Sequence, residues 1–139
     1  MIKLIYWTGT GNTASMAKYI AEGMMQGNKE VELKEVANAS EQDLSEAELV
    51  ILGCPAMGSE ELDDTEMLPF IEEAQAMFSG KKIALFGSYG WGSGEWMELW
   101  KEQMEGFGAK VIIEPLIINE FTKGQDEEIC IQYGKALVG

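Results

Sequence analysis

Residues 8–13 form the segment of this chain whose composition most directly indicates binding chemistry. They read Thr-Gly-Thr-Gly-Asn-Thr and stand between an apolar run at 2–7 and a helical pattern that begins near Ala14. Glycine lets the backbone turn tightly around an anion, and the free N–H groups of a helix start point toward it. The segment has neither the lysine of nucleotide-hydrolysing loops nor the third glycine of a dinucleotide fingerprint. It therefore predicts a loop that holds a phosphate without transferring it. For the loop taken alone, a glycine turn capped by threonine is the alternative. The predicted phosphate-binding residues are Thr8, Gly9, Thr10, Gly11, Asn12 and Thr13.

A second segment, 55–62, follows an apolar run and carries groups suited to a flat ring. Met57 offers a polarizable thioether, which favours contact with an aromatic face. Gly58 permits positive φ, so the turn that contains it can change its peptide orientation at little steric cost. Glu60 can accept a hydrogen bond from a ring N–H. The alternatives are ordinary loop packing for Met57 and a solvated carboxylate for Glu60.

A third segment, 88–94, places Tyr89 and Trp91 among glycines. Aromatic side chains there have no helix or strand face of their own to bury against, which favours stacking on a planar ligand. Trp96 falls inside the next helical pattern and is predicted to lie in the core. The three segments together predict a site for a flat heteroaromatic ring that bears one phosphate, such as flavin mononucleotide (FMN).

Alternating strands and helices must position these segments. Apolar runs predict strands at 2–7, 31–36, 48–54, 81–88 and 111–118, the second at a sheet edge and the last interrupted by Pro115. Helical spacing predicts helices at 14–26, 66–78, 95–107 and 126–137. This alternation is typical of an α/β fold with a parallel sheet between helices. Ligands of such sheets bind beyond the carboxyl ends of the strands, where the three segments are expected to meet.

Composition narrows the class of protein. The 139 residues, 46% of them hydrophobic, suit a single domain over 1–139 and contain no apolar stretch of membrane-spanning length. A net charge of −14, with no arginine or histidine, argues against nucleic acid, anionic membranes and histidine-based catalysis. It favours partners with basic docking surfaces, although acidity can also serve solubility alone. Cys54 and Cys130 have no metal-ligand or redox spacing, and we expect reduced core cysteines in a cytoplasmic monomer.

Three motifs in order make the chain resemble the short-chain flavodoxins of anaerobic bacteria. They span 5–13, 53–62 and 85–97, and the similarity extends over essentially the whole chain, with Thr8 standing where close relatives usually carry serine. The resemblance implies a flavodoxin-like three-layer sandwich with a five-stranded parallel sheet of order 2-1-3-4-5. It also implies a non-enzymatic, low-potential one-electron carrier whose non-covalent FMN shuttles between semiquinone and hydroquinone in place of ferredoxin. Iron–sulfur oxidoreductases, hydrogenase or ferredoxin-type reductases are the implied partners.

The same resemblance implies a role for each segment. Residues 8–13 would hold the phosphate, and Ser88 would lie near the ribityl chain or the dimethylbenzene edge. Met57 would cover the inner ring face and Trp91 the outer one, while Glu60 would bond the N3–H side. The Gly58 carbonyl would turn toward N5 on reduction, and backbone groups of 89–92 would meet the pyrimidine edge. The predicted set beyond the phosphate loop is Pro55, Ala56, Met57, Gly58, Ser59, Glu60, Ser88, Tyr89, Gly90, Trp91, Gly92 and Asn119.

Three other classes of protein share parts of this pattern. A flavin-dependent quinone or nitro reductase needs room for a second ring above the flavin, where Trp91 is expected to stack. A signalling receiver domain needs an acidic cluster after the first strand, where Thr8 and Gly9 stand. A flavin-free interaction module would be colourless and would have no affinity for flavin.

Overall fold

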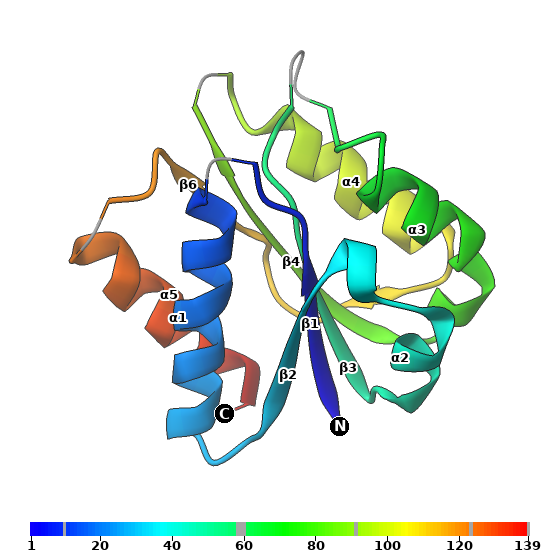
Figure 1. The fold of residues 1–139 in the computed structure, drawn as a ribbon, viewed down its shortest axis with the longest axis horizontal. Coiled ribbons are helices and arrows are strands. Elements are labelled where there is room, and N and C mark those ends of the chain that lie inside the picture. The colour runs from blue at the N-terminus through cyan, green and yellow to red at the C-terminus, as the bar shows by residue number, and fades with distance from the viewer. Residues whose placement is uncertain (10, 58–60, 91, 123, 139) are drawn as a thin grey trace.

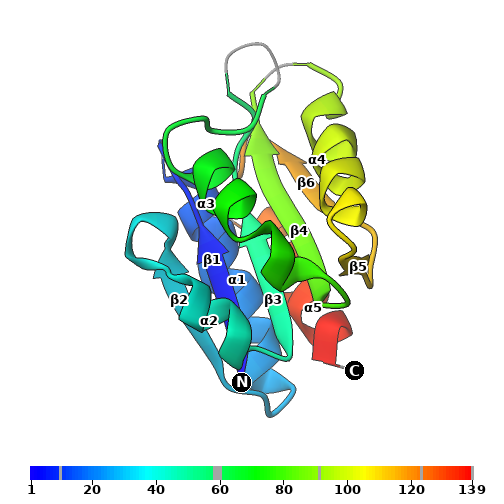
Figure 2. The same cartoon turned by 90° about the vertical axis from the view of Figure 1, so that its right-hand side faces the viewer.

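A parallel β-sheet with helices on both faces organises the chain, as Figures 1 and 2 show. The computed structural model describes residues 1–9, 11–57, 61–90, 92–122 and 124–138. None of the helices within these residues is long and apolar enough to cross a membrane. The parallel sheet with helices on both faces confirms the predicted α/β class.

The sheet has the strand order β2-β1-β3-β4-β5, with β6 also paired to β4, and every pairing is parallel. The strands are β1 (Ile2–Tyr6), β2 (Val31–Glu35), β3 (Leu49–Gly53), β4 (Lys82–Tyr89), β5 (Lys110–Val111) and β6 (Leu116–Asn119). Every residue of β3 is buried, as expected for a strand covered on both faces, whereas β2 leaves Leu33 exposed at the sheet edge. The predicted order 2-1-3-4-5 is confirmed.

The fifth position of the sheet is shared by two short strands. β5 pairs with the start of β4, and β6 pairs with its end, from Phe86 to Tyr89. Pro115 lies between them and has no N–H to donate to a strand neighbour. The hydroxyl of Tyr133 donates to the Glu114 carbonyl at 3.0 Å and so occupies a backbone acceptor at the break. The predicted interruption at Pro115 is confirmed.

Two helical layers cover the sheet. Helices α1 and α5 lie on one face, and α2, α3 and α4 lie on the other (Figure 1). Their bounds are α1 (Asn12–Gln26), α2 (Glu41–Glu46), α3 (Met67–Glu73), α4 (Glu95–Gly106) and α5 (Gln125–Val138). Each layer has its own core, one built around Trp96 and Trp100 and the other around Met16 and Ile20.

Two helix predictions need correction. The helix predicted at 66–78 is divided into α3 and a 3-10 turn at Gln75–Phe78, separated at Ala74. Helix α2 was not predicted, because six residues are too few to establish a helical period. Its N-terminus is closed by a capping box between Ser40 and Asp43.

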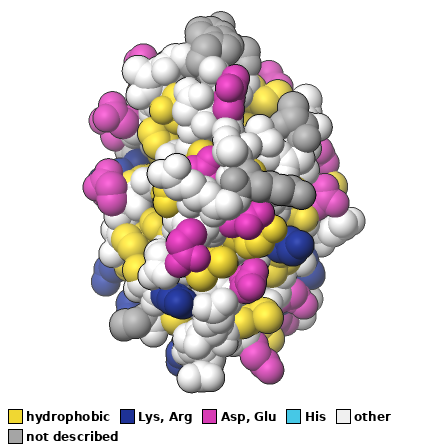
Figure 3. All heavy atoms as spheres, turned by 90° about the vertical axis from the view of Figure 1, so that its left-hand side faces the viewer, with side chains coloured by type: hydrophobic (Ala, Val, Ile, Leu, Met, Phe, Trp, Pro, Cys, Tyr) yellow, Lys and Arg dark blue, Asp and Glu magenta, His cyan; other side chains and the backbone are white. Residues whose placement is uncertain are grey.

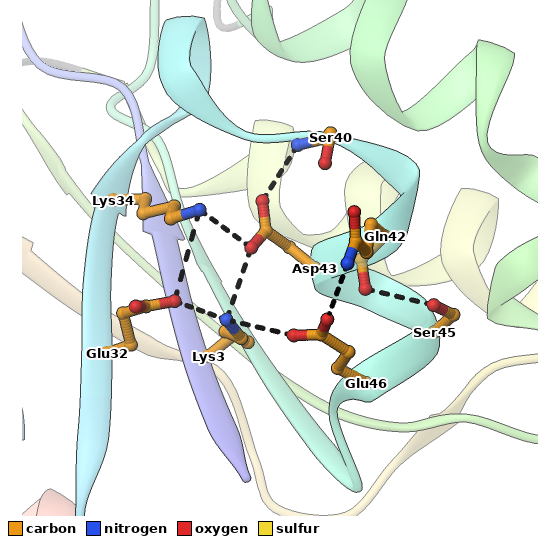
Figure 4. Close-up of polar contacts among 8 residues, drawn as sticks. All are labelled: Lys3, Glu32, Lys34, Ser40, Gln42, Asp43, Ser45 and Glu46. Carbon is orange, nitrogen blue, oxygen red and sulfur yellow. Dashed lines mark hydrogen bonds and ion pairs between the residues drawn. The ribbon is translucent and has the colours of Figure 1, made fainter.

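A buried ion-pair cluster attaches α2 to the edge of the sheet (Figure 4). Lys3 of β1 is only 4% exposed and pairs with Glu32 of β2 and with Asp43 and Glu46 of α2. Burial by itself would raise the pKa of Asp43, but hydrogen bonds from Lys34, the Ser40 amide and Lys3 hold that pKa at about 2. The cluster compensates the desolvation of Lys3 and holds α2 against the first two strands.

Candidate functional site

A pocket of about 300 Å³ lies at the carboxyl-terminal edge of the sheet, the upper edge in Figure 1. Loops that follow β1, β3, β4 and β6 form its wall. The lining residues are Trp7, Gly9, Asn12, Pro55, Ala56, Met57, Ser88, Tyr89, Gly90 and Glu120. The predicted convergence of the three loops at this edge is thus confirmed for their described residues.

The first loop leads into α1 through a left-handed turn. Gly11, the N-cap of α1, has a φ of 99°, which a residue with a side chain adopts only with strain. Its N–H donates to the Thr8 hydroxyl at 3.1 Å, which stabilises the turn. Among the described residues, the first turn of α1 has no side-chain cap and no acidic residue. The backbone N–H groups of this first turn, together with the positive end of the helix dipole, therefore suit an anion.

A hydroxyl pair joins this loop to β4. Thr13 is 1% exposed, and its Oγ1 lies 3.0 Å from the Oγ of Ser88, which is 4% exposed. Either hydroxyl can donate to the other, and each keeps capacity for a further hydrogen bond. The contact joins the start of α1 to the end of β4 at the pocket edge of the sheet.

The second loop is closed by a backbone bridge. Met57 donates its N–H to the Glu61 carbonyl at 2.8 Å, and Glu61 donates to the Met57 carbonyl at 2.9 Å. The base of the loop continues the sheet pairing, since Ala56 donates to the Ser88 carbonyl at 3.0 Å. Met57 is therefore held at the pocket wall by main-chain contacts.

Asp63 anchors the segment that follows this loop. It is 3% exposed and accepts hydrogen bonds from the N–H groups of Glu66 and Met67 and from the Thr65 hydroxyl. Burial alone would raise the pKa of Asp63, but these bonds to its carboxylate lower it below its usual value. A charged side chain thus caps the first turn of α3.

Trp7 is a pocket residue that sequence reasoning missed. Its indole Nε1 donates to Glu66 Oε1 at 2.9 Å, and its backbone N–H donates to the Gly53 carbonyl at 2.9 Å. A Cβ added at Gly9 would lie 3.1 Å from the indole ring, so the ring stands directly beside the first loop. Its place at the end of the first predicted strand, directly before the glycine loop, was the available signal.

The third loop corrects one expectation. Tyr89 lines the pocket but also packs on Trp96, with ring centroids 5.5 Å apart, so it does have a protein face to bury against. Trp96 is 2% exposed, which confirms its predicted place in the core. Gly92 is exposed and has a φ of 95°.

Glu120 forms the remaining wall of the pocket, at a φ of 45°, and donates its N–H to the Tyr89 carbonyl at 2.9 Å. Asn119 lies directly before it, exposed and in register with Tyr89. The described pocket wall therefore carries one carboxylate and no lysine. Thr10, Gly58, Ser59, Glu60 and Trp91 lie outside the described residues, and their predicted roles remain predictions.

The described residues fit FMN chemically. A helix N-terminus without carboxylates suits the phosphate, and the Trp7, Met57 and Tyr89 side chains provide apolar surface for a flat ring. No group of three or more potential metal ligands occurs in the described ranges. Both cysteines are free and buried, and burial raises the pKa of Cys54 to about 12, which keeps its thiol protonated.

Comparisons with known proteins agree with this site. The family model described as flavodoxin matches residues 4–134. Flavodoxins of Clostridium beijerinckii and Megasphaera elsdenii are 45% and 43% identical, over 98% of this chain and 98% and 97% of theirs. The solution structure of two-electron reduced Megasphaera elsdenii flavodoxin, 42% identical, has a TM-score of 0.90 and covers 99% of this chain and 98% of its own. The chain belongs to the flavodoxin family, whose members bind FMN and transfer electrons without being enzymes.

Proposed function

We propose that this flavodoxin is a low-potential one-electron carrier that serves redox enzymes in place of ferredoxin. The observation that carries the proposal is the uncapped, carboxylate-free start of α1, which opens into the pocket beside Gly9 and Asn12 among the described residues. FMN supplies the one-electron chemistry when bound there. The chain's own residues hold the cofactor, orient it and set its reduction potentials.

The proposal gives the following roles to residues of the site. Residues 8–13 hold the phosphate through hydroxyl and backbone N–H groups, each bond to a charged acceptor contributing roughly 1.5–3 kcal/mol. Met57 and Trp7 provide apolar contact for the ring, and Trp91 stacks on its outer face. Glu60 accepts the hydrogen bond from the N3–H side. Asn119 and Glu120 complete the wall next to Tyr89.

Electrostatics favour a low potential. The described pocket wall has no cation to stabilise an added electron, and the whole chain carries a net charge of −14. Acidic side chains are spread over the face that carries α1 and α5, with lysines between them (Figure 3). A unit charge about 10 Å away costs roughly 0.4 kcal/mol in water and more at lower dielectric. Several such charges would make the second one-electron potential more negative by about 100 mV.

The same charge indicates the class of partner. Redox proteins with basic docking surfaces, such as iron–sulfur oxidoreductases, hydrogenase or ferredoxin-type reductases, would be steered toward an acidic carrier. We propose that the protein acts as a monomer in the cytoplasm, consistent with its buried, free cysteines.

Stepwise reduction of the purified protein, followed by visible absorption, tests this function. We expect a yellow protein that releases FMN on denaturation and takes up two electrons in two resolved one-electron steps. Steady-state turnover with a nicotinamide and a quinone should be absent. A colourless protein that takes up no added FMN would contradict the proposal, and rapid turnover would favour a reductase.

A further inference from the structure

We infer that a groove next to the cofactor pocket docks a basic segment of the redox partner, which inserts one apolar side chain. The inference rests on the proposed electron-carrier function. The groove is formed by residues 61–68 together with α4, on the side of the molecule that faces the viewer in Figure 2. Its volume is about 400 Å³.

The floor of this docking groove is apolar. Leu62, Leu68, Trp96, Leu99 and Trp100 contribute to its lining. Leu99 is 53% exposed on a helix that also carries the exposed carboxylates of Glu95, Glu98 and Glu102 and the half-buried Lys101. Burying such a leucine against a partner side chain stabilises a complex by removing apolar surface from water.

The rim of the docking groove is acidic. Glu61 and Asp64 line it, Gln103 is its third polar residue, and no lysine belongs to its described lining. The exposed glutamates of α4 add to this negative field. An acidic or neutral segment would meet repulsion or uncompensated desolvation there, whereas lysine or arginine on both sides of an apolar residue would match the rim.

The docking groove is separate from the cofactor pocket but adjoins it. The two cavities share no described lining residue, yet the reciprocal hydrogen bonds between Met57 and Glu61 join their walls. The Tyr89 ring, which lines the pocket, also packs on Trp96, which lines the groove. A segment held in the groove would therefore place its parent protein one loop away from the cofactor, where electron transfer needs it.

The test uses a blocked peptide, Gly-Lys-Lys-Leu-Lys-Lys-Gly, titrated into FMN-loaded, ¹⁵N-labelled protein. We expect the indole N–H signals of Trp96 and Trp100 to shift, while that of Trp7 stays in place. The matched peptide with glycine in place of leucine should bind about tenfold more weakly, since it lacks the apolar anchor. Leu99→Ser should weaken the leucine peptide by a similar factor, and Asp64→Lys should weaken both peptides.

Leu33→Ser is the matched control, because Leu33 is also exposed but lies on β2 at the opposite edge of the sheet. Equal affinity for the two peptides, unchanged affinity in Leu99→Ser, shifts confined to other faces, or no binding would each overturn the inference. The visible spectrum and reduction potentials separate this outcome from a failure of the proposed function. If the protein is yellow and is reduced in two one-electron steps but does not bind the peptide, only the docking groove is refuted.

Discussion

The indole Nε1 of Trp7 lies 2.9 Å from Oε1 of Glu66, and this contact ties a wall of the cofactor pocket to the N-cap residue of α3. The backbone N–H of Glu66 is in turn held by the buried carboxylate of Asp63. Trp7 is thus oriented by the N-terminal end of α3.

Removal of this acceptor should loosen the pocket wall. We expect Glu66→Ala to weaken FMN binding by about two- to fivefold, because an exposed hydrogen bond contributes roughly 0.5–1 kcal/mol. Glu66→Gln keeps an acceptor oxygen and should stay within twofold of the parent. Quenching of FMN fluorescence by the apoprotein measures all three affinities. Glu73→Ala, an exposed change on the same helix, is the control, and equal losses in both alanine variants would exclude a specific role for the contact.

Gly58 is predicted to allow the peptide reorientation that accompanies the first electron. In Gly58→Ala, positive φ would cost about 1–3 kcal/mol. We expect the first one-electron potential to fall by roughly 50–100 mV, with the absorption of the oxidised protein unchanged. A spectroelectrochemical titration checks this, with Gly106→Ala, a glycine-to-alanine change in open space at the end of α4, as the control. Unchanged potentials in Gly58→Ala would show that a peptide reorientation at Gly58 does not contribute to the first reduction step.

Ionic strength should raise the second one-electron potential. The added electron is opposed by the −14 net charge and by a described pocket wall without lysine, and salt screens such interactions. We expect a rise of some tens of millivolts between about 0.01 and 1 M salt, over which the screening length falls from about 30 to 3 Å. If the potentials stay constant across this range, long-range electrostatics do not contribute to a low second potential, and local contacts must account for it.

Asp43 should make stability depend on acid pH. Its pKa is about 2 in the folded protein against an ordinary 3.8, so its stabilising effect is complete above pH 4 and is lost as pH falls through 2. We expect Asp43→Asn to lower the free energy of unfolding by about 1–3 kcal/mol at pH 7. Urea unfolding at several pH values should show the parent and this variant converging toward pH 2. Glu105→Gln, an exposed change on α4, should track the parent throughout, and a constant gap for Asp43→Asn would disprove the linkage.

Many of the elements were predictable because their signals are local. The four buried residues Leu49, Val50, Ile51 and Leu52 form a strand covered on both faces, and Met97, Trp100 and Met104 mark the inner side of α4 by their spacing alone. Helix α2 was missed because its six residues are too few to show a helical period. Its position against the sheet depends on Asp43 meeting Lys3 and Lys34, which lie on strands far from it in the chain.

The strand–helix alternation and the three loops predicted to hold a flavin could be read from local sequence, since each depends on neighbouring residues and on backbone geometry. Which side chains meet depends on the packing of distant segments. Trp7 and Glu66 are 59 residues apart, and Thr13 and Ser88 are 75 apart. Their contacts follow from the order in which β1, β3 and β4 stand in the sheet, because that order sets which loop ends adjoin. The groove between residues 61–68 and α4 has the same origin, as two segments without common sequence signals pack over one face of that sheet.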